Sequence, residues 1–506
     1  MINFPIHKSP LLSKVVILLL LLVFLISVNS RSLKSINPFA NYDRYPTLDS
    51  VDLYLERFQN QDVSKEEKLA FLTEALNFSK RLKKDTIRRL KLKEIRQGFR
   101  GLNQLEDYLE VNTEIRALAE ELDDSLEIAN TYSHLGYYYL RKEKIDSSYN
   151  SYYLAQRIFA RMNSFEKAGK AMLTMAIIQK NAKDYIGGEA SSVSAIELLK
   201  PSEDLRYLTS AYTNLGLISN ELGRYDKALE YHEMALDGRK KLRKRAKKDK
   251  SLKDNALVVS SLNNMGIVYF NKKQYDKAIA YYEQGLAYDS LFYKRTGTYA
   301  RLLDNLAFTK FRSGETSGLP ELFLRPLFIR DSIGDNLGAV TSHIHLAEYY
   351  KSIDSTADAR EQALIALNKA KPLKYHRGIL EALIVLSESD SETEALNFTR
   401  EYIRISDSLQ QAERRVQEHF ARIRFETDSI ETENTKVTRQ NRQLFIGLLS
   451  LLAIFLLVYI FIQRKLNGKE LRFRESQQKS NEEIYNLMLA QQLKLEEGKR
   501  LEKRRF

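Results

Sequence analysis

The sequence predicts an all-α fold: a solenoid of helix hairpins of about 40 residues each, then one transmembrane helix and a coiled-coil-like tail. Three observations support this fold class. Small residues recur at nearly constant intervals through most of the chain, and a charge-free apolar stretch lies near the C-terminus. Proline is also scarce, with 8 in 506 residues. Because proline and glycine are the residues that most disfavour helices, this composition permits long helices almost everywhere.

The composition disfavours several classes of enzyme. The chain has no cysteine, which excludes disulfides, zinc–thiolate sites and cysteine nucleophiles. It has no glycine-rich phosphate loop and no nucleophile elbow. Of the seven histidines only His343 and His345 are close in sequence, and side chains two positions apart on a helix point in different directions. We therefore expect no metal, no cofactor and no catalytic residue.

The positive charge is concentrated rather than spread. The formal net charge is +13, and ten basic residues lie between Arg239 and Lys253. This cluster does not alternate with aromatic residues, as a surface that stacks nucleic-acid bases would, so no nucleic-acid partner is expected. We interpret the cluster as an exposed connector between two hairpins, with binding of an anionic partner as the alternative.

Residues 1–30 have the features of an export signal. Lys8 and Lys14 precede an apolar run from Val15 to Val28, and the small residues Val28 and Ser30 occupy the −3 and −1 positions of a cleavage site. The run is short for a helix that spans a membrane. The interpretation is a signal peptide cleaved near Ser30, with an uncleaved signal anchor as the alternative.

Residues 444–462 are predicted to cross the membrane. This stretch of 19 residues carries no charge, and at 1.5 Å per residue it measures about 28 Å, close to the hydrocarbon thickness of a bilayer. Both flanks are basic, so their charge does not decide the orientation. The export signal instead places residues 31–443 in the periplasm and the tail, residues 463–506, in the cytoplasm. The prediction is a single-pass protein of the bacterial inner membrane.

An internal repeat occupies residues 41–405. Aligned small residues are spaced 40, 40, 50, 41, 40 and 40 apart, namely Gly136, Ala176, Gly216, Gly266, Ala307, Ala347 and Ser387. Small residues let the two helices of a hairpin approach closely. The predicted packing positions are Gly136, Ala176, Gly216, Ala228, Ala235, Gly266, Ala278, Ala347 and Ala359. The step of 50 falls at the basic cluster.

Two parts of the array depart from the regular unit. The unit near Leu306 is degenerate, because Leu319 and Phe323 replace small residues and Pro320 and Pro326 are predicted to interrupt it. Upstream, Ser64–Leu82 and Leu102–Leu122 show helical periodicity and are predicted to form earlier, atypical turns.

The hairpins from Tyr212 to Ala235 and from Asn264 to Gly285 resemble the tetratricopeptide repeat. The period here is longer than the usual value of about 34 residues, which implies longer helices. The resemblance implies a peptide or protein ligand on a concave surface. Asparagines on first helices are candidates to hold an extended peptide backbone by paired hydrogen bonds: Asn214, Asn263, Asn264 and Asn305. The alternative is that they are ordinary polar surface residues or caps.

Residues 406–443 form a predicted juxtamembrane helix. Apolar residues recur at intervals of seven, at Leu409, Val416, Ile423, Ile430, Val437 and Leu444. This spacing is typical of a coiled-coil seam. The companion positions, among them His419 and Glu426, are polar, so the seam is weak. A homodimer contact that can change register and an amphipathic helix packed on the last repeat are equally compatible with the pattern.

The tail resembles the signalling helix of tetratricopeptide-containing sensor histidine kinases of Bacteroidetes-type bacteria. The resemblance rests on residues 481–489, 491–499 and 502–505, on residues 422–427 before the membrane, and on the order of the segments. In that family a phosphoacceptor helix and an ATP-binding domain follow, and neither is found in the sequence up to Phe506. The expectation is the sensory half of such a kinase, which is not itself an enzyme. The alternative is an envelope scaffold with no signalling output.

Overall fold

The computed structural model describes residues 46–202, 204–245, 252–288, 295–388 and 392–503, and every regular element within these ranges is a helix. The predicted signal at residues 1–30 lies outside the described residues, as do residues 246–251 of the basic cluster. The chain divides into two compact units, residues 1–127 and 128–506. Each unit is described by itself.

The first unit consists of two successive helix pairs. Its helices are α2 (Pro46–Gln59), α3 (Lys65–Ser79), α4 (Thr86–Gly101) and α5 (Leu105–Glu121). The predicted helices at Ser64–Leu82 and Leu102–Leu122 are confirmed as α3 and α5. A reciprocal capping box starts α3: Ser64 Oγ accepts from the Glu67 amide at 3.2 Å, and the Glu67 carboxylate accepts from the Ser64 amide at 3.1 Å.

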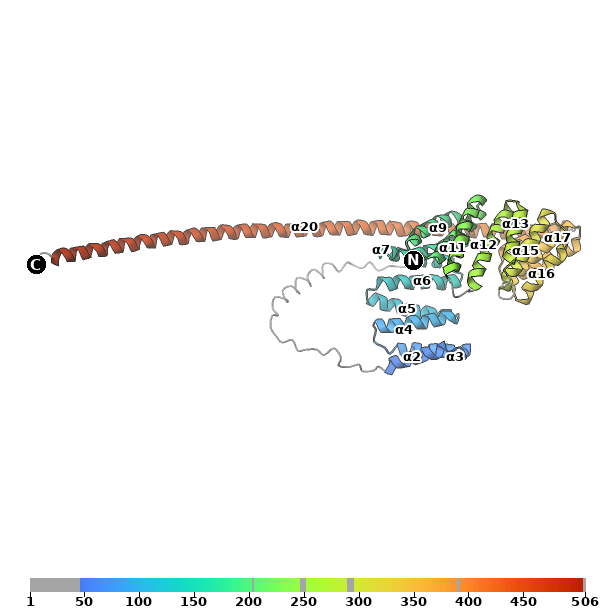
Figure 1. The fold of residues 1–506 in the computed structure, drawn as a ribbon, viewed down its shortest axis with the longest axis horizontal. Coiled ribbons are helices and arrows are strands. Elements are labelled where there is room, and N and C mark those ends of the chain that lie inside the picture. The colour runs from blue at the N-terminus through green and yellow to red at the C-terminus, as the bar shows by residue number, and fades with distance from the viewer. Residues whose placement is uncertain (1–45, 203, 246–251, 289–294, 389–391, 504–506) are drawn as a thin grey trace. The chain divides into compact units, whose positions relative to one another are not determined.

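The second unit is a stack of helix hairpins, and α6 begins just before the boundary between the units. Its helices are α6 (Ser125–Arg141), α7 (Ile145–Arg161), α8 (Phe165–Asn181), α9 (Tyr185–Leu199), α10 (Leu205–Glu221), α11 (Tyr225–Arg245), α12 (Leu252–Asn271), α13 (Tyr275–Leu286), α15 (Thr296–Ser313), α16 (Leu319–Ser332), α17 (Asn336–Ser352), α18 (Thr356–Ala370), α19 (His376–Leu386) and α20 (Glu392–Lys503). Consecutive helices from α7 onward pack against each other, and Figure 1 shows the hairpins following one another along the chain.

The 40-residue period has a simple backbone origin. Residues in the left-handed conformation recur every 20 positions, at Asn103, Asp123, Glu143, Asn163 and Lys183. At each turn the next amide donates to a carbonyl five residues back, as Lys144 does to Tyr139 at 2.9 Å. This bond ends the preceding helix in a Schellman-type motif. The resulting helices are 17 residues long in α5, α7, α8 and α10, as the long period predicted.

The predicted glycines lie where the two helices of a hairpin touch. A Cβ atom on Gly136, Gly216 or Gly266 would lie 2.7, 2.5 and 2.4 Å from the nearest ring atom of Tyr152, His232 and Tyr282, respectively. The ring stands sixteen residues after the glycine each time. The structure also buries every predicted alanine: Ala176, Ala228, Ala235, Ala278, Ala347 and Ala359.

The prediction that prolines interrupt the unit near Leu306 is wrong. Helix α16 begins at Leu319 with Pro320 in its first turn, where a missing amide hydrogen costs little. It continues through Pro326 to Ser332. Leu319 and Phe323 are fully buried, so large residues replace the small ones without opening the hairpin.

The connector interpretation of the basic cluster is wrong for Arg239. This residue lies inside α11 and is 6% exposed. Its guanidinium donates to the Leu257 carbonyl at 2.8 Å, to Thr213 Oγ1 at 2.9 Å and to the Ser261 hydroxyl. Burial lowers the pKa of Arg239 to about 10. Arg239 therefore joins two hairpins from within, whereas Lys240, Lys241 and Arg243 are exposed.

The last helix is unbroken. Helix α20 runs from Glu392 to Lys503 (Figure 1, orange to red), with no interruption at the predicted boundaries 405/406, 443/444 and 462/463. Its first turns are the second helix of the last hairpin, where Phe398, Tyr402 and Ile405 pack on the core of α17–α19. Within Thr432–Leu501 it is long and apolar enough to cross a membrane, and its most apolar window is fully exposed. Membrane crossing itself stays a prediction.

Candidate functional site

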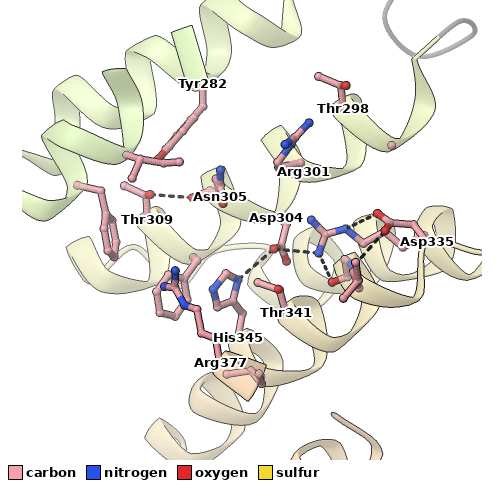
Figure 2. Close-up of a pocket in the computed structure, with 18 of the residues that line it drawn as sticks. Tyr282, Thr298, Arg301, Asp304, Asn305, Thr309, Asp335, Thr341, His345 and Arg377 are labelled. Carbon is pink, nitrogen blue, oxygen red and sulfur yellow. Dashed lines mark hydrogen bonds and ion pairs between the residues drawn. The ribbon is translucent and has the colours of Figure 1, made fainter. Parts of the chain in front are cut away.

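The second unit has a groove of about 1150 Å³ along the first helices of successive hairpins. Helices α10, α12, α15, α17 and α19 supply most of its lining, with Tyr282 of α13 and the end of α16 completing it. Figure 2 shows Asp304 of α15 and His345 of α17 pointing toward one another. The groove is built where the repeat places corresponding positions of neighbouring units side by side.

A buried ion pair forms the floor of this groove. Asp304 is fully buried, and its carboxylate accepts from Arg330 Nη1 at 3.2 Å and from Ser342 Oγ at 2.9 Å. His345 Nδ1 lies 3.1 Å from the same carboxylate, and its ring stacks on Phe308 with centroids 3.9 Å apart. The network links α15, α16 and α17, so it fixes the spacing of three helices.

The surroundings of two carboxyl groups in the groove, those of Asp304 and Glu348, shift their pKa values in opposite directions. Burial by itself would raise the pKa of Asp304, but His345, Arg330 and the Ser342 hydroxyl together hold it below its ordinary value of 3.8. Asp304 therefore stays charged. Burial raises the pKa of Glu348 above its usual value, although Arg312 stands 3.5 Å away.

Arg301 lines the groove and is exposed, and among the described residues it forms no hydrogen bond and no ion pair. Burial and the charge of Arg330 lower its pKa, whereas the charge of Asp335 opposes that shift. Its neighbours are already engaged: Arg330 binds Asp304, and Arg377 donates to Glu381 at 2.8 Å. An unpaired guanidinium is a ready donor for a carboxylate or a carbonyl oxygen of a ligand.

The structure does not bring the four predicted asparagines together in the groove. Asn214 is buried and donates to Ser192 Oγ at 3.0 Å. Asn263 is also buried and accepts from Asn305 Nδ2 at 2.8 Å. Asn264 is half-buried and does not line the cavity. Of the four, Asn305 alone lines it. Asn214 and Asn263 therefore join neighbouring hairpins, and a direct role in binding a partner is left to Asn305.

A second feature is the contact between α20 and helices α7 and α8, far from α20 in sequence. The ring of Phe420 stacks on that of Tyr149 with centroids 4.4 Å apart, and both residues are fully buried. Ile423 and Val416 complete this cluster together with Met175 and Ile178. The prediction of a helix packed on the last repeat is thus too narrow, because α20 also docks near the start of the unit.

Polar contacts flank the apolar cluster on both sides. Asp428 accepts from Tyr153 Oη at 2.8 Å and pairs with Arg157 at 3.1 Å. On the other side Glu413 lies 2.6 Å from Lys183 Nζ. Burial and the Asp428 carboxylate raise the pKa of Tyr153 to about 12. We call this set of apolar and polar contacts, centred on Phe420, the α20 dock.

A smaller cavity of about 700 Å³ shares lining residues with both the groove and the α20 dock. Glu221, Arg377 and Glu381 line both cavities. The smaller cavity is also lined by Leu409 and Glu413 of α20, and by Lys183. A molecule that extends from the groove past Arg377 therefore meets the residues that hold α20.

Sequence reasoning missed both the buried network and the α20 dock. One signal for the network was present: Asp304 stands where the aligned units have Thr213 and Asn263, so a charge replaces a neutral polar residue. No comparable pattern in the sequence indicated the dock, because Tyr149 and Tyr153 have the spacing of ordinary helix-packing residues. Their partners lie more than 250 residues away.

Comparison with known proteins agrees with this architecture. Residues 208–245 and 259–290 match family models described as tetratricopeptide repeat, which correspond to α10–α11 and to most of α12–α13. A search of curated proteins found no match.

Several solved structures are similar in fold. The apo form of the quorum sensor NprR from B. thuringiensis is 14% identical, with a TM-score of 0.50 over 72% of this chain and 97% of that chain. Aspartyl phosphate phosphatase F from Bacillus subtilis is 14% identical, with a TM-score of 0.46 over 77% and 97%. A Rap protein complexed with Competence and Sporulation Factor is 13% identical, with a TM-score of 0.43 over 72% and 98%.

At these identities the similarity shows the fold alone. The chain is an all-α, tetratricopeptide-like solenoid of helix pairs that ends in a long apolar helix.

Proposed function

We propose that this chain is a membrane-anchored receptor. In this proposal the groove binds a peptide or a segment of a partner protein outside the membrane, and α20 relays the binding event through the bilayer. The chain acts without catalysis of its own, as the sensory half of a two-component system would. The NprR structure of similar fold is that of a quorum sensor, which is consistent with a sensory role.

The observation that carries the proposal is the continuity of α20. One helix is the last element of the array, makes the α20 dock, and runs without a break into the apolar stretch at residues 444–462. About 24 Å of helix separates Asp428, which ends the dock, from Leu444. A helix transmits displacement along its axis, so a change at the dock reaches the membrane.

The groove supplies the chemistry for a peptide. Its wall combines the aromatic rings of Phe270 and Phe308 with the amide of Asn305 and the guanidinium of Arg301. Apolar walls with a few convergent polar groups are typical of ligand sites. Arg301 favours a ligand that presents a carboxylate.

Peptide selection tests the binding step. The full chain in lipid nanodiscs is used to select from a library of random twelve-residue peptides displayed on phage. We expect acidic peptides to be enriched and to bind the Arg301→Glu variant at least about tenfold more weakly, because the charge change turns attraction into repulsion. Lys227→Glu makes the same charge change at an exposed position outside the groove and should bind as the parent does. Enriched peptides that bind Arg301→Glu as well as the parent would refute the groove as the site.

Hydrogen exchange tests the relay. An enriched peptide should accelerate amide exchange in residues 409–428 of α20. Binding without any change there would favour the alternative function, an envelope scaffold that assembles other proteins on the array. The predicted topology is tested in cells with the cysteine-free chain: a cysteine at Gln440 should react with a membrane-impermeant maleimide, and one at Ser480 should not.

A further inference from the structure

The α20 dock covers the same side of the helix that carries the seven-residue repeat. Of the repeat positions, Leu409 lines the smaller cavity, Val416 packs in the dock, and Ile423 is 8% exposed within it. Farther along, Val437 and Leu444 are 46% and 72% exposed. The array therefore covers the seam at Val416 and Ile423 and leaves Val437 and Leu444 open.

We propose that the partner of this seam is a second copy of the chain, and that the array and the second copy compete for Val416 and Ile423. This inference rests on the proposed function, because it takes the chain to be anchored in a membrane. Anchored copies are parallel and share one plane, which raises their effective concentration. Apolar residues at intervals of seven pair with the same residues of a parallel copy.

Competition follows from geometry. Val416 and Ile423 face one direction on the helix, and the dock already fills that direction with Tyr153, Met175 and Ile178. A second copy can pair with Val416 and Ile423 only after α20 leaves the array. The companion positions His419 and Glu426 weaken the pairing, so the dock prevails in the parent chain and pairing requires release of α20 from the array.

Phe420 lies four residues after Val416, on the same face of the helix, and its ring is fully buried against Tyr149. Substitution of Phe420 weakens the dock and keeps Val416 and Ile423, but it also changes the face that carries them. Tyr153 and Arg157 belong to the array, so their substitution weakens the dock and leaves α20 itself unaltered.

Disulfide trapping in the cysteine-free chain tests the proposal with full-length protein in lipid vesicles. Val437→Cys places a thiol on the seam, and Thr435→Cys places one on the opposite side of the helix as the matched control. We expect Phe420→Ala to raise the rate of intermolecular disulfide formation at position 437 about tenfold, because loss of a buried aromatic pair releases the helix. Adding Ile423→Asp should return the rate to that of the Thr435→Cys control.

A change on the array side gives the same test with α20 unaltered. Tyr153→Phe combined with Arg157→Ala removes the two donors to Asp428 and should also raise trapping at position 437. The proposal would be overturned by an unchanged rate of disulfide formation at position 437 in both Phe420→Ala and the Tyr153→Phe, Arg157→Ala variant. An equal rise in that rate at position 435 would overturn it as well. This test uses no ligand, so its outcome is independent of the peptide selection. If the rate of disulfide formation is unchanged but acidic peptides still select the groove, the pairing of two copies is rejected and the receptor proposal stands.

Discussion

Two regions of the second unit are built from hairpins of the same repeat and differ in what covers them. Near α7 and α8 the aromatic rings Tyr149 and Tyr153 are covered by α20 of the same chain. Near α15 and α17 the corresponding space is an open groove over the charged network of Asp304. The repeat fixes the spacing of the helices, whereas the side chains decide whether the space between them takes a helix of the same chain or remains open to a ligand.

The largest expected effect lies under the open groove. Asp304→Ala removes the buried counterion of Arg330 and leaves it only the half-buried Asp335 at 3.9 Å, and loss of one partner of a buried pair costs about 3–5 kcal/mol. We expect this loss in the free energy of unfolding, measured by urea denaturation of the detergent-solubilised chain and followed by circular dichroism. The double variant Asp304→Leu with Arg330→Met should recover most of it, because an apolar pair leaves no charge uncompensated. Equal instability of both variants would show that the charges are not the cause.

The covered region gives the second prediction. Phe420→Ala removes a fully buried ring and should weaken the α20 dock by about 3 kcal/mol, the lower end of the range for buried aromatic residues. Amide exchange should rise in residues 416–428 and stay unchanged in α15 and α17. Phe425→Ala is the matched control, since its ring is 75% exposed on the same helix. Accelerated exchange throughout the array would mean that the dock holds the whole unit together.

The hairpin between the two regions carries a pH-sensitive residue. His232 is buried, neither ring nitrogen has a partner among the described residues, and burial followed by the charge of Arg239 lowers its pKa to about 4. The unfolded chain takes up this proton near pH 6.5, and the folded chain does not. Stability is therefore lost as the pH falls from about 6.5 to about 4, by up to about 3 kcal/mol.

His232→Tyr should remove this dependence on pH. Tyrosine occupies the same place against the glycine in two other hairpins, as Tyr152 and Tyr282 show. The variant should keep its helical content. Between pH 6.5 and pH 4.5 its free energy of unfolding should fall less than that of the parent, because only the contribution of acidic groups, which both proteins share, remains. A parent chain with no such extra loss would indicate that His232 is protonated in the folded state.

The smallest effect on stability is expected at Arg301. Arg301→Glu changes an exposed residue that forms no hydrogen bond and no ion pair among the described residues, so the free energy of unfolding should stay within about 0.5 kcal/mol of the parent. The change should appear in peptide binding instead. A large loss of stability in this variant would make Arg301 part of the network around Asp304, and the groove would then be less open than its geometry indicates.

The sequence determined the parts of this protein that depend on local patterns. The interval of 40 residues, the glycines at Gly136, Gly216 and Gly266, and the apolar stretch at 444–462 are properties of neighbouring residues, and periodicity in the chain records them. The fold class and the helix lengths followed from these patterns.

Only the tertiary structure decided which polar residues are buried and where α20 lies. Arg239 and Asn214 are of residue types usually found at the surface, but both are buried between hairpins, because stacked repeats bring distant positions into contact. The seam on α20 is equally suited to a neighbouring copy or to its own array, since a seven-residue pattern specifies an apolar face and not its partner. Tyr149 and Phe420 settle that choice for the single chain, through a contact that no local pattern encodes.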